Sequence, residues 1–309
     1  MHKPGFDPGL TQQFNAPLRR VIEKDGSFNV HRRGTTWRDF HPYLHLINIG
    51  WCRFLAMVFL GYLAVNTIFA GLYYSLGPGQ LQGADALTHS GRFLNDFFFS
   101  VHTLSTVGYG NISPKGMQAN IVAAFESLVG VLGFAVATGL LFGRVSRPSA
   151  KIGFSETMLI APYQDVTSLQ FRVVNRRSND LMELEARLLL MTVETQDGKP
   201  VRQYKQLKLE REGVLFLPLT WTVVHPIDDD SPLRGKTQAD LHELQAEVII
   251  MVKAWDETFS QTVHQRFSYH YGEIVWNARF TPAFAVNEEG DMILDVDRVG
   301  SYAEIGAAR

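Results

Sequence analysis

The sequence predicts a membrane protein of mixed α and β structure, with a pore module of two membrane-spanning helices followed by a β-sandwich domain. Two apolar runs, residues 47–76 and 117–143, are each longer than the roughly 20 residues that a helix needs to cross a bilayer. After residue 146, strand-like stretches such as SLQFRVVN and AEVIIMVKA recur at the spacing of a β-sandwich. Charge divides the 309 residues at the same place, since residues 1–151 hold 13 Lys and Arg against 7 Asp and Glu, and the remainder 16 against 24.

The two apolar runs predict an outer helix over 47–76 and an inner helix over 117–143. The first run follows 46 mostly polar residues and is too long for the apolar part of a cleaved signal peptide. Lys and Arg gather before the first run and after the second, whereas only Arg92 and Lys115 stand between them. Positive charge favours the cytoplasmic side, so both termini are expected in the cytoplasm. A buried helical hairpin of a soluble protein is the alternative, and nothing in the chain is basic enough to suggest a nucleic-acid partner.

A shorter pore helix is predicted between the two runs, over residues 95–106. Asn95 or Asp96 can cap its start, and about three turns of helix reach only about 15–18 Å, half of a bilayer. Pro114 prevents the chain from continuing as helix. Irregular backbone at membrane depth is stable only where protein buries it or where it lines a watery cavity. The sequence therefore predicts a re-entrant loop.

Residues 106–110 read TVGYG, the sequence of the selectivity filter of potassium channels. The resemblance implies that K⁺ is held by the backbone carbonyls of four residues: Thr106, Val107, Gly108 and Tyr109. Carbonyls that all point one way need backbone angles that only glycine adopts freely, here at Gly108 and Gly110. One copy offers too few oxygens and no second filter occurs in the chain, so a homotetramer is expected. K⁺ is the expected permeant ion, and no cofactor is expected.

The filter and three further stretches resemble the inward rectifier (Kir) potassium channels, and prokaryotic members in particular. The stretches are TLSTVGYGNISP, ATGLLFGRVSRPSAKIGFS, LPLTWTVVHPIDDDSPL and EIVWNARF. The resemblance implies a channel for passive K⁺ conduction, gated where the inner helices cross and by the cytoplasmic domain, in a bacterial inner membrane. It also implies three regions: an N-terminal cytoplasmic segment over 1–46 with an amphipathic slide helix at about 35–46, a pore domain over 47–145, and an immunoglobulin-like sandwich over 146–309.

Other functions fit the sequence less well. An enzyme is not expected, because the chain contains no nucleophile elbow, HExxH motif or phosphate-binding loop. A membrane-anchored sensor or receptor, with a non-conducting pore and a ligand-binding sandwich, is the alternative function. Asp228, Asp229 and Asp230 form an acidic run that could hold a divalent cation. Beside Pro226 and Pro232, however, the run is typical of a solvated loop.

Phe134, Thr138 and Phe142 lie four residues apart in the second run, within a sector of about 80° on a helix. The resemblance implies that this face lines the pore, with Phe134 and Thr138 in the cavity and Phe142 as a hydrophobic gate at the constriction. Phe134 stands where acidity sets strong rectification in the family, so strong block by polyamines is not expected. Packing of these phenylalanines against lipid or other helices is the alternative.

Two ionisable residues are expected to support the filter. Glu126 is the one carboxylate of the second run, and a charged group inside a membrane is costly and usually functional. We expect it behind the filter, hydrogen-bonded near the pore helix. His102 stands four residues before Thr106, where the resemblance places a supporting glutamate in eukaryotic relatives. Packing in the core without a filter role is the alternative for His102.

Basic and aromatic residues near the inner ends of the two runs are candidates for binding anionic lipid. They are Trp37, Arg38, Arg144, Arg147 and Lys151. Clusters of this kind attract anionic head groups and would couple the bilayer to the gate. The same basic residues also act as topology signals, which requires no specific lipid.

Overall fold

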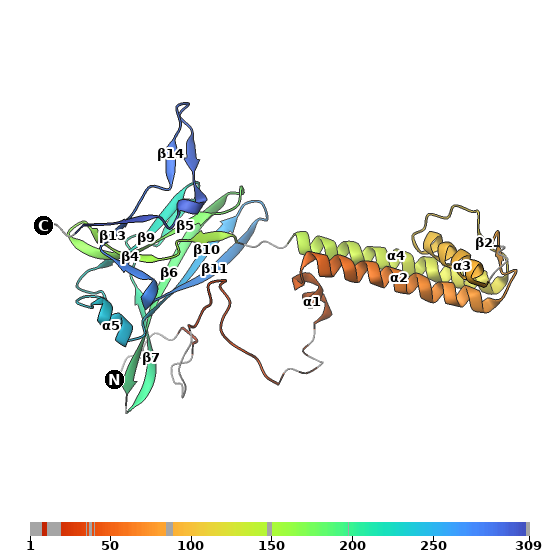
Figure 1. Ribbon diagram of the computed structural model, residues 1–309, viewed down its shortest axis with the longest axis horizontal. Coiled ribbons are helices and arrows are strands. Elements are labelled where there is room, and N and C mark those ends of the chain that lie inside the picture. The colour runs from red at the N-terminus through yellow and green to blue at the C-terminus, as the bar shows by residue number, and fades with distance from the viewer. Residues whose placement is uncertain are drawn as a thin grey trace. The chain divides into compact units, whose positions relative to one another are not determined.

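The computed structural model describes residues 8–10, 20–34, 36, 39, 41–84, 89–146, 150–196 and 198–306 (Figure 1). The chain divides into two compact units. One unit is Arg33–Arg147, and the other combines Met1–Arg32 with Pro148–Arg309. The long helices belong to the first unit and the large sheets belong to the second.

The described residues of the first unit form helices and one short β-ladder. The helices are α1 (Pro42–Asn48), α2 (Trp51–Leu76), α3 (His89–Leu104) and α4 (Met117–Val145). The ladder pairs β1 (Leu81–Gln82) with β2 (Ser113–Pro114). α2 has 26 residues and α4 has 29, and both are long and apolar enough to cross a membrane. Figure 1 shows α2 and α4 side by side, with α3 against one end of the pair.

The helix before α2 starts later than the sequence predicts. The expected slide helix covers about 35–46, whereas α1 begins at Pro42. Proline suits the first turn of a helix because it has no N–H to donate, and it interrupts a helix that runs through it. Before α1, the Asp39 carboxylate accepts hydrogen bonds from the N–H and hydroxyl of Thr36, at 2.8 and 3.0 Å. The outer helix then starts at Trp51, four residues later than predicted.

α3 starts earlier than predicted, at His89 instead of Asn95, and is 16 residues long. Asn95 and Asp96 therefore lie inside the helix, where other contacts replace the expected capping role. The Asn95 amide donates to the Ala84 carbonyl at 3.2 Å, and Asp96 lies 4.0 Å from Arg92 one turn earlier. At 1.5 Å per residue α3 spans about 24 Å, which is still shorter than the roughly 30 Å hydrocarbon core.

The second unit is a β-sandwich of two five-stranded sheets. The first sheet has the order β11-β10-β6-β7, with β8 also paired to β6, and its strands are β6 (Leu181–Gln196), β7 (Lys199–Leu207), β8 (Gly213–Phe216), β10 (Glu247–Asp256) and β11 (Gln261–His270). The second has the order β12-β4-β5-β3, with β9 also paired to β5, and its strands are β3 (Ile152–Phe154), β4 (Met158–Tyr163), β5 (Val166–Asn175), β9 (Thr220–Ile227) and β12 (Ile274–Trp276). The pairing is antiparallel except between β12 and β4.

The core of the sandwich follows from alternation along the strands. Along β6, Leu184, Ala186 and Leu188 are buried, whereas Glu185 and Arg187 between them are exposed. Successive side chains of a strand point to opposite faces, so each strand contributes every second residue to one face. The buried face of β6 packs in a single cluster with apolar residues of β5 and β10: Leu169, Phe171, Val173, Val248, Ile250 and Val252.

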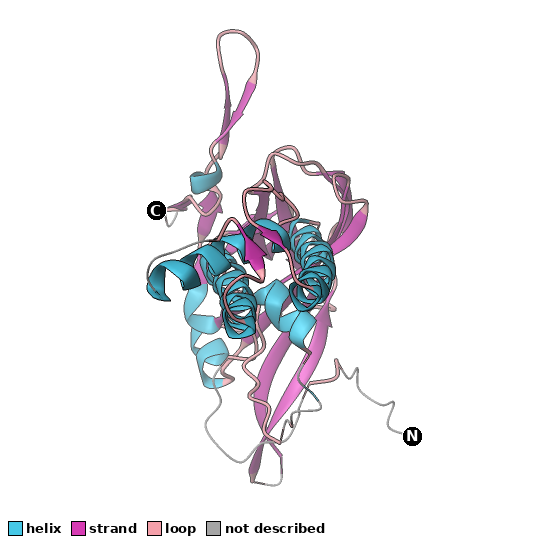
Figure 2. Ribbon diagram, turned by 90° about the vertical axis from the view of Figure 1, so that its right-hand side faces the viewer, coloured by secondary structure: helices cyan, strands magenta, loops and turns pink. Residues whose placement is uncertain are grey.

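Smaller elements complete this unit. They are α5 (Gln238–Glu243), the 3₁₀ turns η2 (Tyr271–Glu273) and η3 (Val296–Arg298), and the strand pairs β13 (Ala278–Phe280) with β16 (Tyr302–Glu304) and β14 (Phe284–Val286) with β15 (Met292–Leu294). Figures 1 and 2 show the β14–β15 hairpin extending away from the two sheets.

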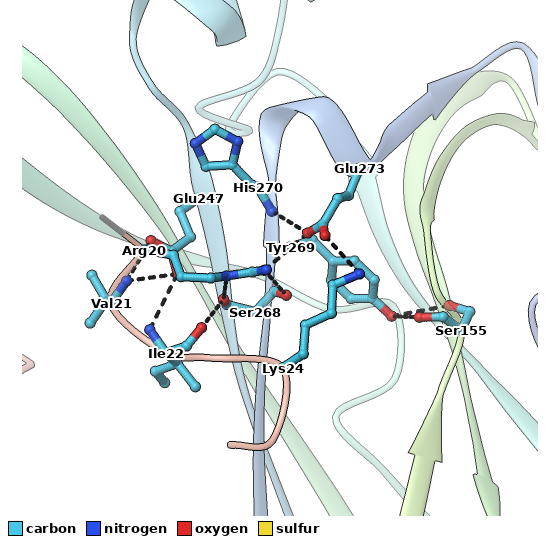
Figure 3. Close-up of polar contacts among 10 residues, drawn as sticks. All are labelled: Arg20, Val21, Ile22, Lys24, Ser155, Glu247, Ser268, Tyr269, His270 and Glu273. Atoms are coloured by element: carbon cyan, nitrogen blue, oxygen red, sulfur yellow. Dashed lines mark hydrogen bonds and ion pairs between the residues drawn. The ribbon is translucent and has the colours of Figure 1, made fainter. Parts of the chain in front are cut away.

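An N-terminal segment binds the sandwich at β10 and β11 (Figure 3). The Val21 N–H donates to the carboxylate of Glu247 at 3.0 Å, and the Ser268 hydroxyl donates to the Ile22 carbonyl at 2.8 Å. Val21 and Ile22 pack in one cluster with three residues of the first sheet: Met191, Tyr204 and Ile249. The segment therefore adds both polar and apolar contacts to this sheet.

Glu273 anchors the same N-terminal segment through two cations. Its carboxylate lies 2.9 Å from Arg20 and 2.8 Å from Lys24, and it also accepts a hydrogen bond from the His270 N–H. Burial alone would raise the pKa of Glu273, but the hydrogen bonds from Lys24, His270 and Arg20 hold it below its usual value.

Candidate functional site

The predicted filter, residues 106–110, follows the C-terminal end of α3. Thr106, Gly108 and Gly110 have positive φ angles of 60°, 56° and 80°. The sequence predicts such angles at the two glycines. The positive φ of Thr106 is not expected from the sequence, because a β-branched residue rarely adopts this conformation. In a β-strand φ stays negative throughout, so a change of sign at every second residue is a distinct backbone pattern. Strain of this kind typically marks a functional segment.

The side chains of the filter are uncovered in a single chain. Val107 is 53% exposed and Tyr109 is 73% exposed. Large apolar and aromatic side chains at such exposure are typical of surfaces that another molecule covers.

His102 contacts the filter through its backbone and its ring. Its carbonyl oxygen accepts hydrogen bonds from the N–H groups of Val107 at 2.9 Å and Gly108 at 3.2 Å. Its ring meets the Tyr109 ring edge to face, with centroids 4.8 Å apart. The last turn of α3 therefore fixes the start of the filter.

Glu126 of α4 lies at the centre of a buried polar network. The carboxyl group is fully buried and accepts a hydrogen bond from the Tyr73 hydroxyl of α2 at 2.7 Å. The Ser100 hydroxyl of α3 contacts the other carboxyl oxygen and also lies 3.1 Å from the Asn66 amide oxygen of α2. The network thus connects the three helices α2, α3 and α4.

At Gly130, α4 approaches the end of α3 closely. A Cβ added at Gly130 would overlap the carbonyl oxygen of Leu104, so the approach requires glycine. Next to this contact lies a cavity of about 790 Å³ between α2, α4 and the filter. Residues that line it include Phe59, Tyr62, Thr106, Gly130 and Phe134.

The predicted pore face of α4 makes little contact within the chain. Phe134 is 77% exposed and Phe142 is 71% exposed, and Thr138 between them is exposed as well. Two large aromatic side chains on one helix face, uncovered in a membrane-spanning helix, are available to line a pore or to contact another chain or lipid.

Comparison with known proteins decides the family. The model for the inward rectifier potassium channel C-terminal domain matches residues 152–309, and an ion channel model matches residues 54–147. The chain is 34% identical over 301 residues to the inward rectifier potassium channel Kirbac3.1 of Paramagnetospirillum magnetotacticum, which covers 96% of this chain and 100% of that protein. The chain belongs to the inward rectifier potassium channel family.

More distant inward rectifiers are similar over most of the chain. The G protein-activated inward rectifier potassium channel 4 of Homo sapiens is 26% identical over 90% of this chain and 72% of its own length. The G protein-activated inward rectifier potassium channel 2 of Rattus norvegicus is 26% identical over 88% of this chain and 69% of its own length.

Family membership confirms three predictions. The chain is a potassium channel with K⁺ as the permeant ion, and it is not an enzyme. Its fold is a pore module of two membrane-spanning helices followed by the inward rectifier's cytoplasmic β-sandwich.

Arg144 of this inward rectifier lies in an environment that the sequence did not indicate. Its guanidinium group donates to the carbonyl oxygens of Ile47 at 3.0 Å and Ile49 at 2.6 Å, and it also contacts that of Leu46. It lies over the rings of Trp51 and Phe54, with its central carbon 4.7 and 4.5 Å from their centroids. Arg144 therefore holds the junction of α1 and α2 against α4.

The other lipid candidates are less constrained. Lys151 is exposed, and its backbone carbonyl accepts a hydrogen bond from the Arg176 N–H at 3.0 Å. Trp37, Arg38 and Arg147 lie outside the described residues.

The acidic run 228–230 lies in a loop that a hydrogen bond and an ion pair stabilise. Asp228 accepts the Asp230 N–H at 3.1 Å, and Asp229 pairs with Arg234. His225 lies 2.8 Å from the Ser231 hydroxyl, and burial lowers the pKa of this histidine. Among the described residues, no group of three or more His, Cys, Asp or Glu could hold a metal ion.

Sequence analysis missed the partners of Glu126. Asn66, Tyr73 and Ser100 are fully or almost fully buried polar residues of α2 and α3. Each of them is a polar residue within an apolar segment. This indicates a hydrogen-bond partner, because a buried polar group needs one. Sequence alone does not say which partner each of them meets.

Proposed function

We propose that four copies of the chain assemble around one axis and conduct K⁺ through their joined filters. In this proposal K⁺ is held by the backbone carbonyls of four residues: Thr106, Val107, Gly108 and Tyr109. The change in the sign of φ at Thr106, Gly108 and Gly110 carries the proposal, because it can turn successive carbonyls toward one side. The exposed side chains of Val107 and Tyr109 support a tetramer, which would cover them.

The inner helix would supply the cavity and the gate. We assign Phe134 and Thr138 to the cavity and Phe142 to a hydrophobic constriction that closes by excluding water. Support comes from their shared face on α4 and from the exposure of both phenylalanines. Without a carboxylate at Phe134, the cavity holds polyamines and Mg²⁺ only weakly.

The filter would be supported from α3 and α4. His102 supports it through its carbonyl and its ring, and Glu126 supports it through the network that joins three helices. Both residues act through neighbouring groups and are not proposed to touch the ion.

The channel would lie in the bacterial inner membrane with both termini in the cytoplasm. Anionic lipid would modulate it through basic and aromatic residues near the inner ends of the helices: Trp37, Arg38, Arg147 and Lys151. Arg144 is assigned a different main role, since its two terminal nitrogens make three hydrogen bonds within the chain and its Nε is buried. It would couple α1 to the gate, and any head group would find few donors left on it.

The experiment that tests this function is rubidium uptake into liposomes that contain the purified protein. The proposal expects uptake that barium blocks, that depends on anionic lipid, and that accompanies a tetramer in native mass spectrometry. Absence of uptake in several lipid compositions would instead favour the non-conducting receptor.

A further inference from the structure

The network around Glu126 contains few protons for its many acceptors. The Ser100 hydroxyl has one proton to donate but lies next to two possible acceptors, the Asn66 amide oxygen and a carboxyl oxygen of Glu126. The Tyr73 hydroxyl donates its single proton to the other carboxyl oxygen. The direction of each hydrogen bond then follows from counting the protons and the acceptors.

Asn66 fixes the direction of the first bond. Its amide nitrogen donates to the Tyr62 carbonyl at 2.8 Å, since an amide oxygen in that place would face another acceptor. The Asn66 oxygen therefore points to Ser100 and needs a donor. Within the described part of the chain, the Ser100 hydroxyl is the donor that lies within reach of this oxygen.

The Ser100 proton is then used, and a proton is still required between Ser100 and Glu126. An ionised Glu126 would place two acceptors in contact, whereas a protonated one donates to the Ser100 oxygen. No cation among the described residues pairs with Glu126: on α3, Arg92 is directed to Asp96 at 4.0 Å and to the Tyr74 carbonyl at 2.6 Å. A fully buried carboxylate without a cation is costly, which favours the neutral form on independent grounds.

We propose that Glu126 is a neutral carboxylic acid that donates its proton to Ser100 and thereby positions the pore helix α3 against α2 and α4. The chain of bonds runs from Glu126 to Ser100, from Ser100 to Asn66, and from Asn66 to the backbone of α2, while Tyr73 satisfies the remaining carboxyl oxygen. In this chain the Glu126, Ser100 and Tyr73 protons each have one acceptor.

This arrangement bears on the filter because Ser100 lies close to it on α3. His102, two residues later, accepts the N–H groups of Val107 and Gly108, and Leu104 contacts Gly130. A shift of α3 at Ser100 would therefore move the first filter residues. Glu126 is a positioning residue, and its carboxyl need not face the ion. The inference deepens the role proposed above for Glu126 behind the filter.

The test compares Glu126→Gln with Glu126→Ala in the lipid-reconstituted tetramer. Glutamine is also neutral, and its amide can donate to Ser100 while its oxygen accepts from Tyr73. We expect rubidium flux within about twofold of wild type for E126Q, and a loss of about tenfold or more for E126A, which leaves buried polar groups unpaired. Glu243→Gln, at an exposed position of α5, is the matched control.

Infrared difference spectra supply a readout that does not depend on conduction. Wild type minus E126Q should contain the C=O stretching band of a protonated acid, which is absent from wild type minus E243Q. Ser100→Ala should shift that band to the frequency of a more weakly hydrogen-bonded acid. This variant replaces E126A in the test if E126A does not fold. A carboxylate band at Glu126, or an E126Q variant as inactive as E126A, would overturn the proposal. An acid band in a tetramer without flux would support the inference and count against the channel function.

Discussion

The guanidinium group of Arg144 donates a hydrogen bond to the carbonyl oxygen of Ile49 at 2.6 Å and thereby ties α4 to the segment between α1 and α2. The proposed gate residue Phe142 lies two residues before Arg144. Because arginine presents several donors in one rigid plane, it can hold the end of α1 and stack on aromatic rings at the same time. Movement of α1 would therefore be transmitted to the inner end of α4.

Replacing Arg144 by lysine tests this coupling. A lysine ammonium cannot match the planar fork or stack on Trp51 and Phe54, so R144K should lower the free energy of unfolding by about 1–3 kcal/mol. The dependence of rubidium flux on anionic lipid should remain. Thermal unfolding in lipid nanodiscs and flux in lipid series provide the two measurements.

Lys151→Gln is the matched variant for the R144K experiment. Lys151 is exposed, so its replacement should leave stability within about 0.5 kcal/mol of wild type and weaken the dependence on anionic lipid. If R144K instead keeps its stability and abolishes the lipid dependence, Arg144 is a lipid ligand and the coupling role is wrong.

Phe142→Ala tests the gate. In the proposed tetramer this change removes four aromatic rings from the constriction, which should let water enter it and raise rubidium flux several-fold at fixed lipid composition. Leu141→Ala is the control, because Leu141 is 43% exposed on the neighbouring helix position and lies about 100° away around α4. Equal flux in the two variants would count against a gate at Phe142.

Gly130→Ala separates close packing from helix flexibility. The added methyl group would overlap the Leu104 carbonyl, so G130A should destabilise the folded protein by about 1–3 kcal/mol and reduce flux. Gly133→Ala meets no atom within 4 Å and should be tolerated, since alanine also favours helix. If both variants reduce flux with unchanged stability, the glycines serve bending and not packing.

Local constraints were predictable from the sequence. The glycines at 108 and 110 indicated positive φ because few other residues adopt it, and the two membrane helices followed from length and apolar composition. Strand-like stretches at regular spacing indicated the sandwich, and the alternation of buried and exposed residues along β6 agrees with that prediction. Each of these signals lies within a short stretch of chain.

Long-range contacts were not predictable in the same way. Arg144 binds backbone carbonyls almost one hundred residues earlier. Because every residue has a backbone carbonyl, the sequence does not indicate which of them an arginine will bind. The Asn95 amide likewise donates to the Ala84 carbonyl, a contact outside α3, instead of capping the start of the helix. A capping preference depends on neighbouring residues alone and does not indicate such a partner.

Acid should release the N-terminal segment from the sandwich. The pKa of Glu273 is lower in the folded protein than its usual value of 4.5, so its contribution to docking is present above that value and is lost as pH falls through the folded pKa. A spin label at Asn29, on the same segment, should become more mobile below about pH 4.5. Glu273→Gln should raise the mobility already at neutral pH; a label equally immobile in E273Q would show that other contacts suffice.

Reversal potentials of the purified channel in planar bilayers are the sharpest test of a potassium-selective filter made by four copies of residues 106–110. With K⁺ on one side and Na⁺ on the other, the reversal potential should give a K⁺ permeability far above that of Na⁺. A reversal potential near zero, with Na⁺ as permeant as K⁺, would contradict it.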